Sequence, residues 1–86
     1  MIAIAAQVSL YPLRQDSLSP AIEEALRIFR EHGLEVQLGP MSTMITGGDV
    51  DLFAALQEAF HRAAEQGHVV MAVTFSNACP VPVRSE

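Results

Sequence analysis

The chain contains 86 residues with a formal net charge of −5, and half of its residues are apolar. This length suits a single domain. The five positively charged residues are all arginines and are scattered, so the sequence lacks the basic stripe that nucleic-acid binding requires. The lone cysteine, Cys79, excludes an intramolecular disulfide, and no apolar run approaches the length of a membrane span.

The N-terminal segment predicts a strand and a cytoplasmic location. Residues 2–11 alternate between larger apolar side chains and smaller or mildly polar ones, a pattern typical of a strand. The first seven residues carry no positive side chain ahead of the apolar stretch, so they do not read as a signal peptide. We therefore expect a cytoplasmic protein.

A helix and a hairpin are predicted next. Ser19–Pro20 is expected to open the helix, because serine caps free amide groups and proline fits the first helical position. Gly33 is expected to end it, since glycine commonly follows the last helical residue. Residues 34–38 and 41–46 then predict a β-hairpin that turns at Gly39–Pro40.

The last part of the chain predicts a second helix and a fourth strand. Gly47–Gly48 is expected to break the preceding strand, and Asp49 to cap the second helix. The fourth strand covers residues 69–77 and completes a single domain over residues 1–77. The prolines within residues 78–86 cannot continue a strand ladder, so we expect an extended tail there.

The order β-α-β-β-α-β predicts an α+β, ferredoxin-like two-layer sandwich. In this fold an antiparallel four-stranded sheet of order 4-1-3-2 carries two helices on one face and leaves the other face open. A thin core cannot bury all the apolar residues of so short a chain. We therefore expect the open face to pair with another copy, giving a dimer or a tetramer.

No catalytic or metal-binding motif is evident. The three histidines do not have the spacing of zinc ligands. The neighbouring carboxylates at positions 23–24 point in different directions on a helix, so they do not form an acid–base pair. Nothing close to Cys79 in the sequence would activate it as a nucleophile. We expect a protein that is not an enzyme and that holds no metal or cofactor.

Several polar residues are expected to meet on the open face. In the order 4-1-3-2, the end of the first strand lies beside the start of the third. This places Ser9 and Tyr11 near Met41 and Thr43, with Gln7 one step further along the same face. Hydroxyls, an amide, a ring and a thioether suit a small heteroaromatic ligand. The alternative is that these side chains form a mildly polar interface between copies.

Three blocks of sequence resemble the YkoF-like family of small thiamine-binding proteins. They are the first-strand segment VSLYPL (8–13), the helix start SPAIEEAL (19–26) and the segment LGPMST (38–43), in which Ser42 replaces the usual glycine. The resemblance implies a ferredoxin-like fold, assembly into dimers and tetramers, and binding of thiamine or its hydroxymethylpyrimidine part without catalysis.

The resemblance also implies which residues bind the ligand. Ser9 and Tyr11 of the first block and Met41 and Thr43 of the third would line the site. The geometry of the sheet, and not the resemblance, adds Gln7 as a further polar contact. Asn77 is expected at the far end of the sheet, so it could join a site only from another subunit.

Three hypotheses about function follow. The leading one is a homo-oligomeric, non-catalytic protein, a dimer or a homotetramer, that binds thiamine or a related pyrimidine. The second is a structural or regulatory module that pairs sheets and has no ligand. The third is a small enzyme of the dimeric α+β barrel type, which requires a deep cavity between sheet and helices with a histidine inside it.

Overall fold

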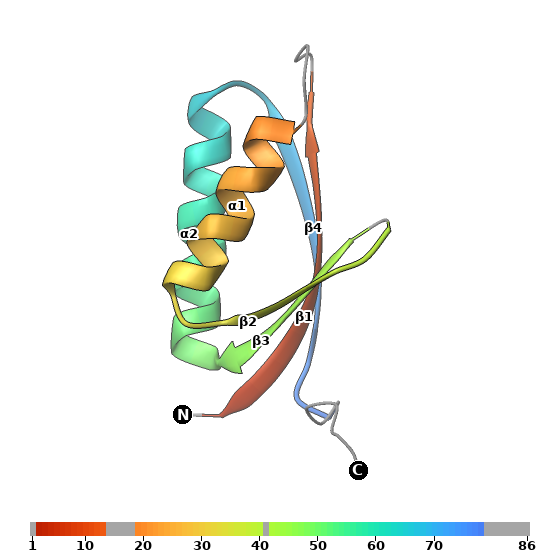
Figure 1. The fold of residues 1–86 in the computed structure, drawn as a ribbon, viewed down its shortest axis with the longest axis vertical. Helices are drawn as coiled ribbons and strands as arrows, with labels where there is room; N and C mark the ends of the chain where they lie inside the picture. Colours follow the sequence, from red (N-terminus) through yellow and green to blue (C-terminus); the bar gives the residue numbers. More distant parts are fainter. Residues whose placement is uncertain (1, 14–18, 41, 79–86) are drawn as a thin grey trace.

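The computed structural model describes residues 2–13, 19–40 and 42–78. Its strands run in the order β2-β3-β1-β4, and every neighbouring pair is antiparallel. Both helices cover one face of this sheet (Figure 1). The predicted ferredoxin-like fold is confirmed, since the order 4-1-3-2 is the same sheet counted from the other edge. The elements are β1 (Ala3–Pro12), α1 (Ser19–Glu31), β2 (Glu35–Leu38), β3 (Thr43–Gly48), α2 (Asp49–Glu65) and β4 (Val69–Ser76).

The core lies between the helices and the sheet. Alternation along β1 directs Ile4, Ala6 and Val8 towards the helices, where all three are buried. The largest fully buried side chains come from both layers: Phe29, Ile28, Ile45 and Leu52. Packing the helices on the sheet removes these apolar side chains from water. This hydrophobic burial is the main force that holds the two layers together.

Helix α1 ends where the glycine predicts. Gly33 has a left-handed φ of +79°, which glycine adopts without a Cβ clash. The amide of Gly33 donates to the Arg30 carbonyl at 3.0 Å, and that of Leu34 donates to the Phe29 carbonyl at 3.2 Å. This pair of bonds is the Schellman arrangement, which satisfies carbonyls that would otherwise lack a partner at the helix end.

The glycine pair before α2 does not break the strand, contrary to the prediction. β3 continues through Gly48, and Ile4 and Ala3 of β1 pair with Gly47 and Gly48. A Cβ added at Gly47 would lie 2.5 Å from Leu34 Cδ2, so the strand needs glycine at this point for packing.

The prediction that Asp49 caps α2 is also wrong. Gly48 is the cap residue and Asp49 the first helical residue. The Asp49 backbone amide donates to the Ile2 carbonyl at 2.8 Å, and the Ile2 amide donates to Asp49 Oδ1 at 3.2 Å. These two bonds tie the start of the described chain to the start of α2.

The β2–β3 hairpin separates from β1 at its tip. β2 and β3 pair from Glu35–Thr46 to Leu38–Thr43, and the Gly39 amide donates to the Ser42 carbonyl at 2.8 Å within the turn. The last pair between β3 and β1 is Thr43–Val8, whereas β1 pairs with β4 as far as Pro12. The twisted hairpin therefore points away from the end of β1 (Figure 1).

Two remaining sequence expectations concern the ends and the membrane. The predicted extended tail lies, apart from Ala78, outside the described residues. None of the helices in the described part of the chain is long and apolar enough to cross a bilayer.

Candidate functional site

A cavity of about 150 Å³ opens where the hairpin separates from β1. The end of β1 forms one wall, the start of α1 another, and the β2–β3 turn closes the third side. We call it the hairpin cavity. It is lined by Val8, Ser9, Leu10, Ile22, Leu38, Gly39, Pro40, Ser42 and Thr43.

Three hydroxyl-bearing residues line the hairpin cavity: Ser9, Ser42 and Thr43, each of them partly buried. Among the described residues, no side-chain hydrogen bond is formed by these three hydroxyls. Leu10 and Ile22 contribute the apolar part of the wall. The cavity thus combines free donors and acceptors with apolar surface.

Thr43 lies on the opposite face of the sheet from the one predicted. It pairs with Val8, and residues directly opposite each other in antiparallel strands share a face. Val8 is buried against the helices, so Thr43 also faces them, and it borders a second, apolar cavity of about 30 Å³ beneath α1. Ser9 and Thr43 nevertheless line the same hairpin cavity, because the hairpin twists away from β1 there.

Gln7 and Tyr11 lie on the open face and do not line the hairpin cavity. Gln7 pairs with Met44 on one side and Thr74 on the other, and Tyr11 pairs with Val70. Half of the Tyr11 surface is exposed, at 51%. Met41 lies outside the described residues, so its predicted place beside Tyr11 remains a prediction.

Asn77 lies at the opposite end of the sheet from Ser9. It follows β4, whose last residue Ser76 pairs with Ala5 near the start of β1. There it borders an open surface cavity of about 420 Å³ together with Ile2, Phe53 and Phe75. Within one chain, Asn77 therefore does not meet the residues of the hairpin cavity.

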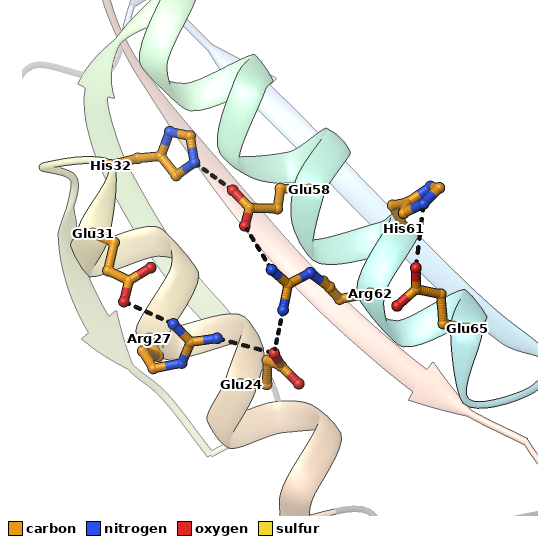
Figure 2. Close-up of polar contacts among 8 residues, drawn as sticks. All are labelled: Glu24, Arg27, Glu31, His32, Glu58, His61, Arg62 and Glu65. Atoms are coloured by element: carbon orange, nitrogen blue, oxygen red, sulfur yellow. Dashed lines mark hydrogen bonds and ion pairs between the residues drawn. The ribbon is translucent and has the colours of Figure 1, made fainter.

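The charged residues of the two helices form a network on their outer surface (Figure 2). His32 Nε2 lies 2.8 Å from Glu58 Oε1, and Arg62 donates to Glu24 at 3.0 Å, so the network joins α1 to α2. Arg27 adds hydrogen bonds to Glu31 at 2.7 Å and to Glu24 at 2.9 Å along α1.

This network shifts the pKa values of two of its members. The hydrogen bond from His32 lowers the pKa of Glu58, and the carboxylates of Glu31 and Glu24 raise the pKa of Arg27. The exposed members are well solvated, so the network positions the helices and adds little to stability.

A metal-binding cluster is not found among the described residues. No group of three or more histidine, cysteine or acidic side chains among them could hold a metal ion. The cavity between sheet and helices is apolar apart from Thr43, and none of the three histidines lines it. This cavity therefore lacks the histidine that the barrel-enzyme hypothesis requires.

The sequence did not indicate Ile22 or Leu38 as site residues. Both read as ordinary apolar positions of a helix and a strand. They reach the cavity because the start of α1 lies over the diverging hairpin, a placement that only the three-dimensional fold reveals. Ser42 could have been found, since it directly precedes Thr43 within the LGPMST segment.

Comparison with known proteins gives a family and a set of structural neighbours. A model of the YKOF-related family matches residues 3–82. A hypothetical protein from Methanocaldococcus jannascii superposes with a TM-score of 0.84 at 24% identity, with 95% of this chain and 87% of that chain covered. A protein from Streptococcus pneumoniae gives a TM-score of 0.79 at 18% identity, with 87% and 86% covered.

A third neighbour is a candidate thiamine biosynthesis/salvage protein from Thermotoga maritima. Its TM-score is 0.75 at 16% identity, with 85% of this chain and 81% of that chain covered. At these identities the structural likeness establishes the fold. No curated protein sequence gave a match.

Proposed function

Because the chain belongs to the YkoF-related family, whose model matches residues 3–82, we propose that it binds thiamine through its pyrimidine ring, or a related hydroxymethylpyrimidine. The hairpin cavity is the proposed site. The resemblance of VSLYPL and LGPMST to family segments supports this choice, since Ser9, Ser42 and Thr43 of those segments line the cavity.

The size of the cavity is the observation that carries the proposal. At about 150 Å³ it is smaller than the 300–1,000 Å³ typical of drug-sized ligands. A cavity of roughly 150 Å³ is enough for one benzene ring. A single six-membered heteroaromatic ring therefore fits, and the thiazolium part of thiamine would remain outside in solvent.

The lining suits a pyrimidine chemically. An aminopyrimidine offers ring nitrogens as acceptors and an amino group as a donor, and a hydroxyl can serve either role. Ser9, Ser42 and Thr43 supply such groups, while Leu10 and Ile22 would contact the faces of the ring. Binding would thus combine hydrogen bonds with apolar burial.

We propose binding without catalysis. A serine or threonine hydroxyl needs an adjacent base to act as a nucleophile. No histidine or carboxylate lines the hairpin cavity in the described structure. Storage, delivery or sensing of the pyrimidine would each be compatible with such a site.

Self-association through the open face is the second part of the proposal. Of the strand residues that alternation places on this face, Glu35 alone is charged. The exposed side chains there include Tyr11 and Met44, which water solvates poorly. A second sheet would cover them, and Gln7 and Tyr11 would then belong to the contact between copies. Asn77 could reach a ligand only across such a contact.

Calorimetric titration tests the ligand. Purified protein should bind hydroxymethylpyrimidine and thiamine with similar affinity, because both present the same ring, and should not bind the isolated thiazole alcohol. Equal binding of the thiazole, or no heat and no thermal shift with any of the three at millimolar concentration, would exclude the proposed site.

Light scattering tests the assembly. We expect an oligomer at micromolar concentration, and Met44→Lys should lower its mass by placing a charge on the open face. Thr46→Val, a neutral change on the same strand and face, is the control and should keep the wild-type mass. A monomeric wild-type protein would contradict self-association.

A further inference from the structure

The apolar cavity beneath α1 adjoins the hairpin cavity. The two cavities share four lining residues: Val8, Leu10, Ile22 and Thr43. The apolar cavity has a volume of about 30 Å³, and its other walls are formed by Ala25, Leu26, Phe29 and Met71. A ring held in the hairpin cavity therefore lies next to this smaller space, and one small substituent of the ring can point into it.

We expect the apolar cavity to be dry. Among its described lining residues, Thr43 alone has a polar side chain. A buried water molecule needs about two to four hydrogen-bond partners, and a single hydroxyl offers too few. The walls of a dry cavity lack contact atoms on one side, so an apolar group that enters gains those contacts.

A methyl group matches this cavity in size and polarity. It is about as large as a water molecule, which occupies roughly 30 Å³ in the liquid. The apolar cavity has about the same volume, and aliphatic and aromatic side chains form most of its wall. A longer or polar substituent would suit it less well.

From this pairing of cavities we infer that the apolar cavity beneath α1 selects the ligand by taking a methyl group at carbon 2 of the pyrimidine ring. The inference rests on the proposed pyrimidine site and narrows its ligands to the 2-methyl-4-aminopyrimidines. The pyrimidine ring of thiamine belongs to this class. Cytosine and uracil carry an oxygen at the same carbon and do not.

Carbon 2 is the ring position that fits both cavities. It lies opposite carbon 5, through which thiamine carries its thiazolium part, so a methyl group pointing inward leaves the thiazolium in solvent. Carbon 2 also lies between the two ring nitrogens. Thr43 borders both cavities, and its hydroxyl can donate to the nitrogen beside the methyl group.

The same arrangement disfavours an oxygen at carbon 2. A carbonyl oxygen in the apolar cavity would lose its contact with water, which is costly unless a donor replaces it. Thr43 has one hydroxyl proton to donate, so it can serve the carbonyl oxygen or a ring nitrogen, but not both. The cavity therefore separates this ligand class from the 2-oxo nucleobases.

Calorimetric titration of the full chain with three matched compounds tests the inference. They are 4-amino-5-hydroxymethylpyrimidine, its 2-methyl derivative and 5-hydroxymethylcytosine, which differ in the group at carbon 2. The methyl compound should bind about 10-fold more tightly than the compound with hydrogen at carbon 2. 5-Hydroxymethylcytosine should bind on the order of 100-fold more weakly than the methyl compound.

A variant separates the cavity from the electronic effect of the methyl group on the ring. Ala25 is buried on α1 and lines the apolar cavity but not the hairpin cavity, so Ala25→Val fills the space and leaves the ring site intact. This variant should bind the compound with hydrogen at carbon 2 like the wild type and should lose the 10-fold preference for the methyl compound.

Ala21→Val is the matched control. It makes the same substitution on the same helix, at a partly buried position that lines neither cavity. It should keep the methyl preference of the wild type. Cooperative thermal unfolding of each variant confirms that it is folded, and the three compounds decide the question on the wild type alone if Ala25→Val does not fold.

Equal affinity of the wild type for the hydrogen and methyl compounds would overturn the inference and leave the proposed pyrimidine site standing. So would a methyl preference that survives in folded Ala25→Val, or binding of 5-hydroxymethylcytosine as tight as that of the methyl compound. No heat with any of the three compounds would remove the pyrimidine site itself, and this inference with it.

Discussion

Replacing Thr43 by valine should weaken pyrimidine binding without destabilising the fold. The substitution keeps the branched shape of the side chain and removes only the hydroxyl. In the described structure this hydroxyl has no protein partner, and it lies between the hairpin cavity and the apolar cavity beneath α1. Removing a partly buried hydroxyl that bonds nothing should leave stability equal or slightly higher.

The expected loss of affinity follows from one hydrogen bond. A typical hydrogen bond contributes about 0.5–1.5 kcal/mol, which corresponds to a dissociation constant raised about 2- to 13-fold. Calorimetric titration with hydroxymethylpyrimidine measures this change, and urea denaturation without ligand measures stability. We therefore expect a higher dissociation constant for the pyrimidine in Thr43→Val and an unchanged free energy of unfolding.

Thr46→Val is a matched control for this experiment. Thr46 lies on the same strand but pairs with Ala5 and Glu35 on the open face, away from the hairpin cavity. The same hydroxyl removal there should not change pyrimidine affinity. Wild-type affinity in Thr43→Val, or an equal loss in both variants, would refute the assignment of Thr43 to the ligand site.

Three further predictions concern stability. Glu58→Gln should lower the melting temperature at neutral pH, because the His32 contact lowers the pKa of Glu58 and so favours the folded state above the usual carboxyl pKa. The difference from wild type should shrink as the pH falls below the ordinary carboxyl pKa, and it should vanish once folded Glu58, whose pKa is lowered, has taken up its proton. A gap that persists in stronger acid, or that also occurs in Glu23→Gln, would argue against this cause. Gly33→Ala should lower the free energy of unfolding by about 1–2 kcal/mol in chemical denaturation, because alanine is strained at a φ of +79°. No atom lies within 4 Å of the added methyl, so a steric clash would not contribute to this loss. An unchanged midpoint would mean that the helix end has relaxed. Ile45→Ala should cost roughly 2–5 kcal/mol because Ile45 is completely buried, and a loss below that range would show that the core collapses into the space.

Much of the fold was predictable because its signals are local. Ser19–Pro20 and Gly33 define α1 through backbone chemistry that involves only neighbouring residues. Alternation along residues 2–11 identified which side of β1 is buried. The order of the elements then left few arrangements of the sheet, since antiparallel pairing and short connections restrict the topology.

What failed depends on contacts between distant residues. Gly47–Gly48 was interpreted as a break, but both residues pair with β1. A glycine suits position 47 because Leu34 occupies the space in which a Cβ would lie. Asp49 was expected to cap its own helix, but its carboxylate binds the amide of Ile2 instead. Sequence patterns do not report either of these contacts.

For the candidate site, the sequence predicted one pair of neighbouring residues. Ser9 and Thr43 were expected to be close, and both line the hairpin cavity. Thr43 was placed on the wrong face of the sheet, because its facing depends on the register of β3 against β1. Gln7 and Tyr11 do not line the cavity, and Met41 stays a prediction. A shift of one residue in register moves every side chain of a strand to the other face.

The unequal support of the two walls of the hairpin cavity has a consequence for how a ligand would enter and leave. Among the strands that the structure describes, β1 alone is hydrogen-bonded on both sides to strands distant in sequence. It runs directly from this doubly paired stretch into the cavity wall at Ser9. The facing wall, around Gly39 and Ser42, is attached through a turn and a four-residue strand. The turn should therefore govern how long a ligand stays bound. Substitutions at Gly39 or Ser42 should alter the dissociation rate of the ligand while the backbone of β1 keeps the same shape.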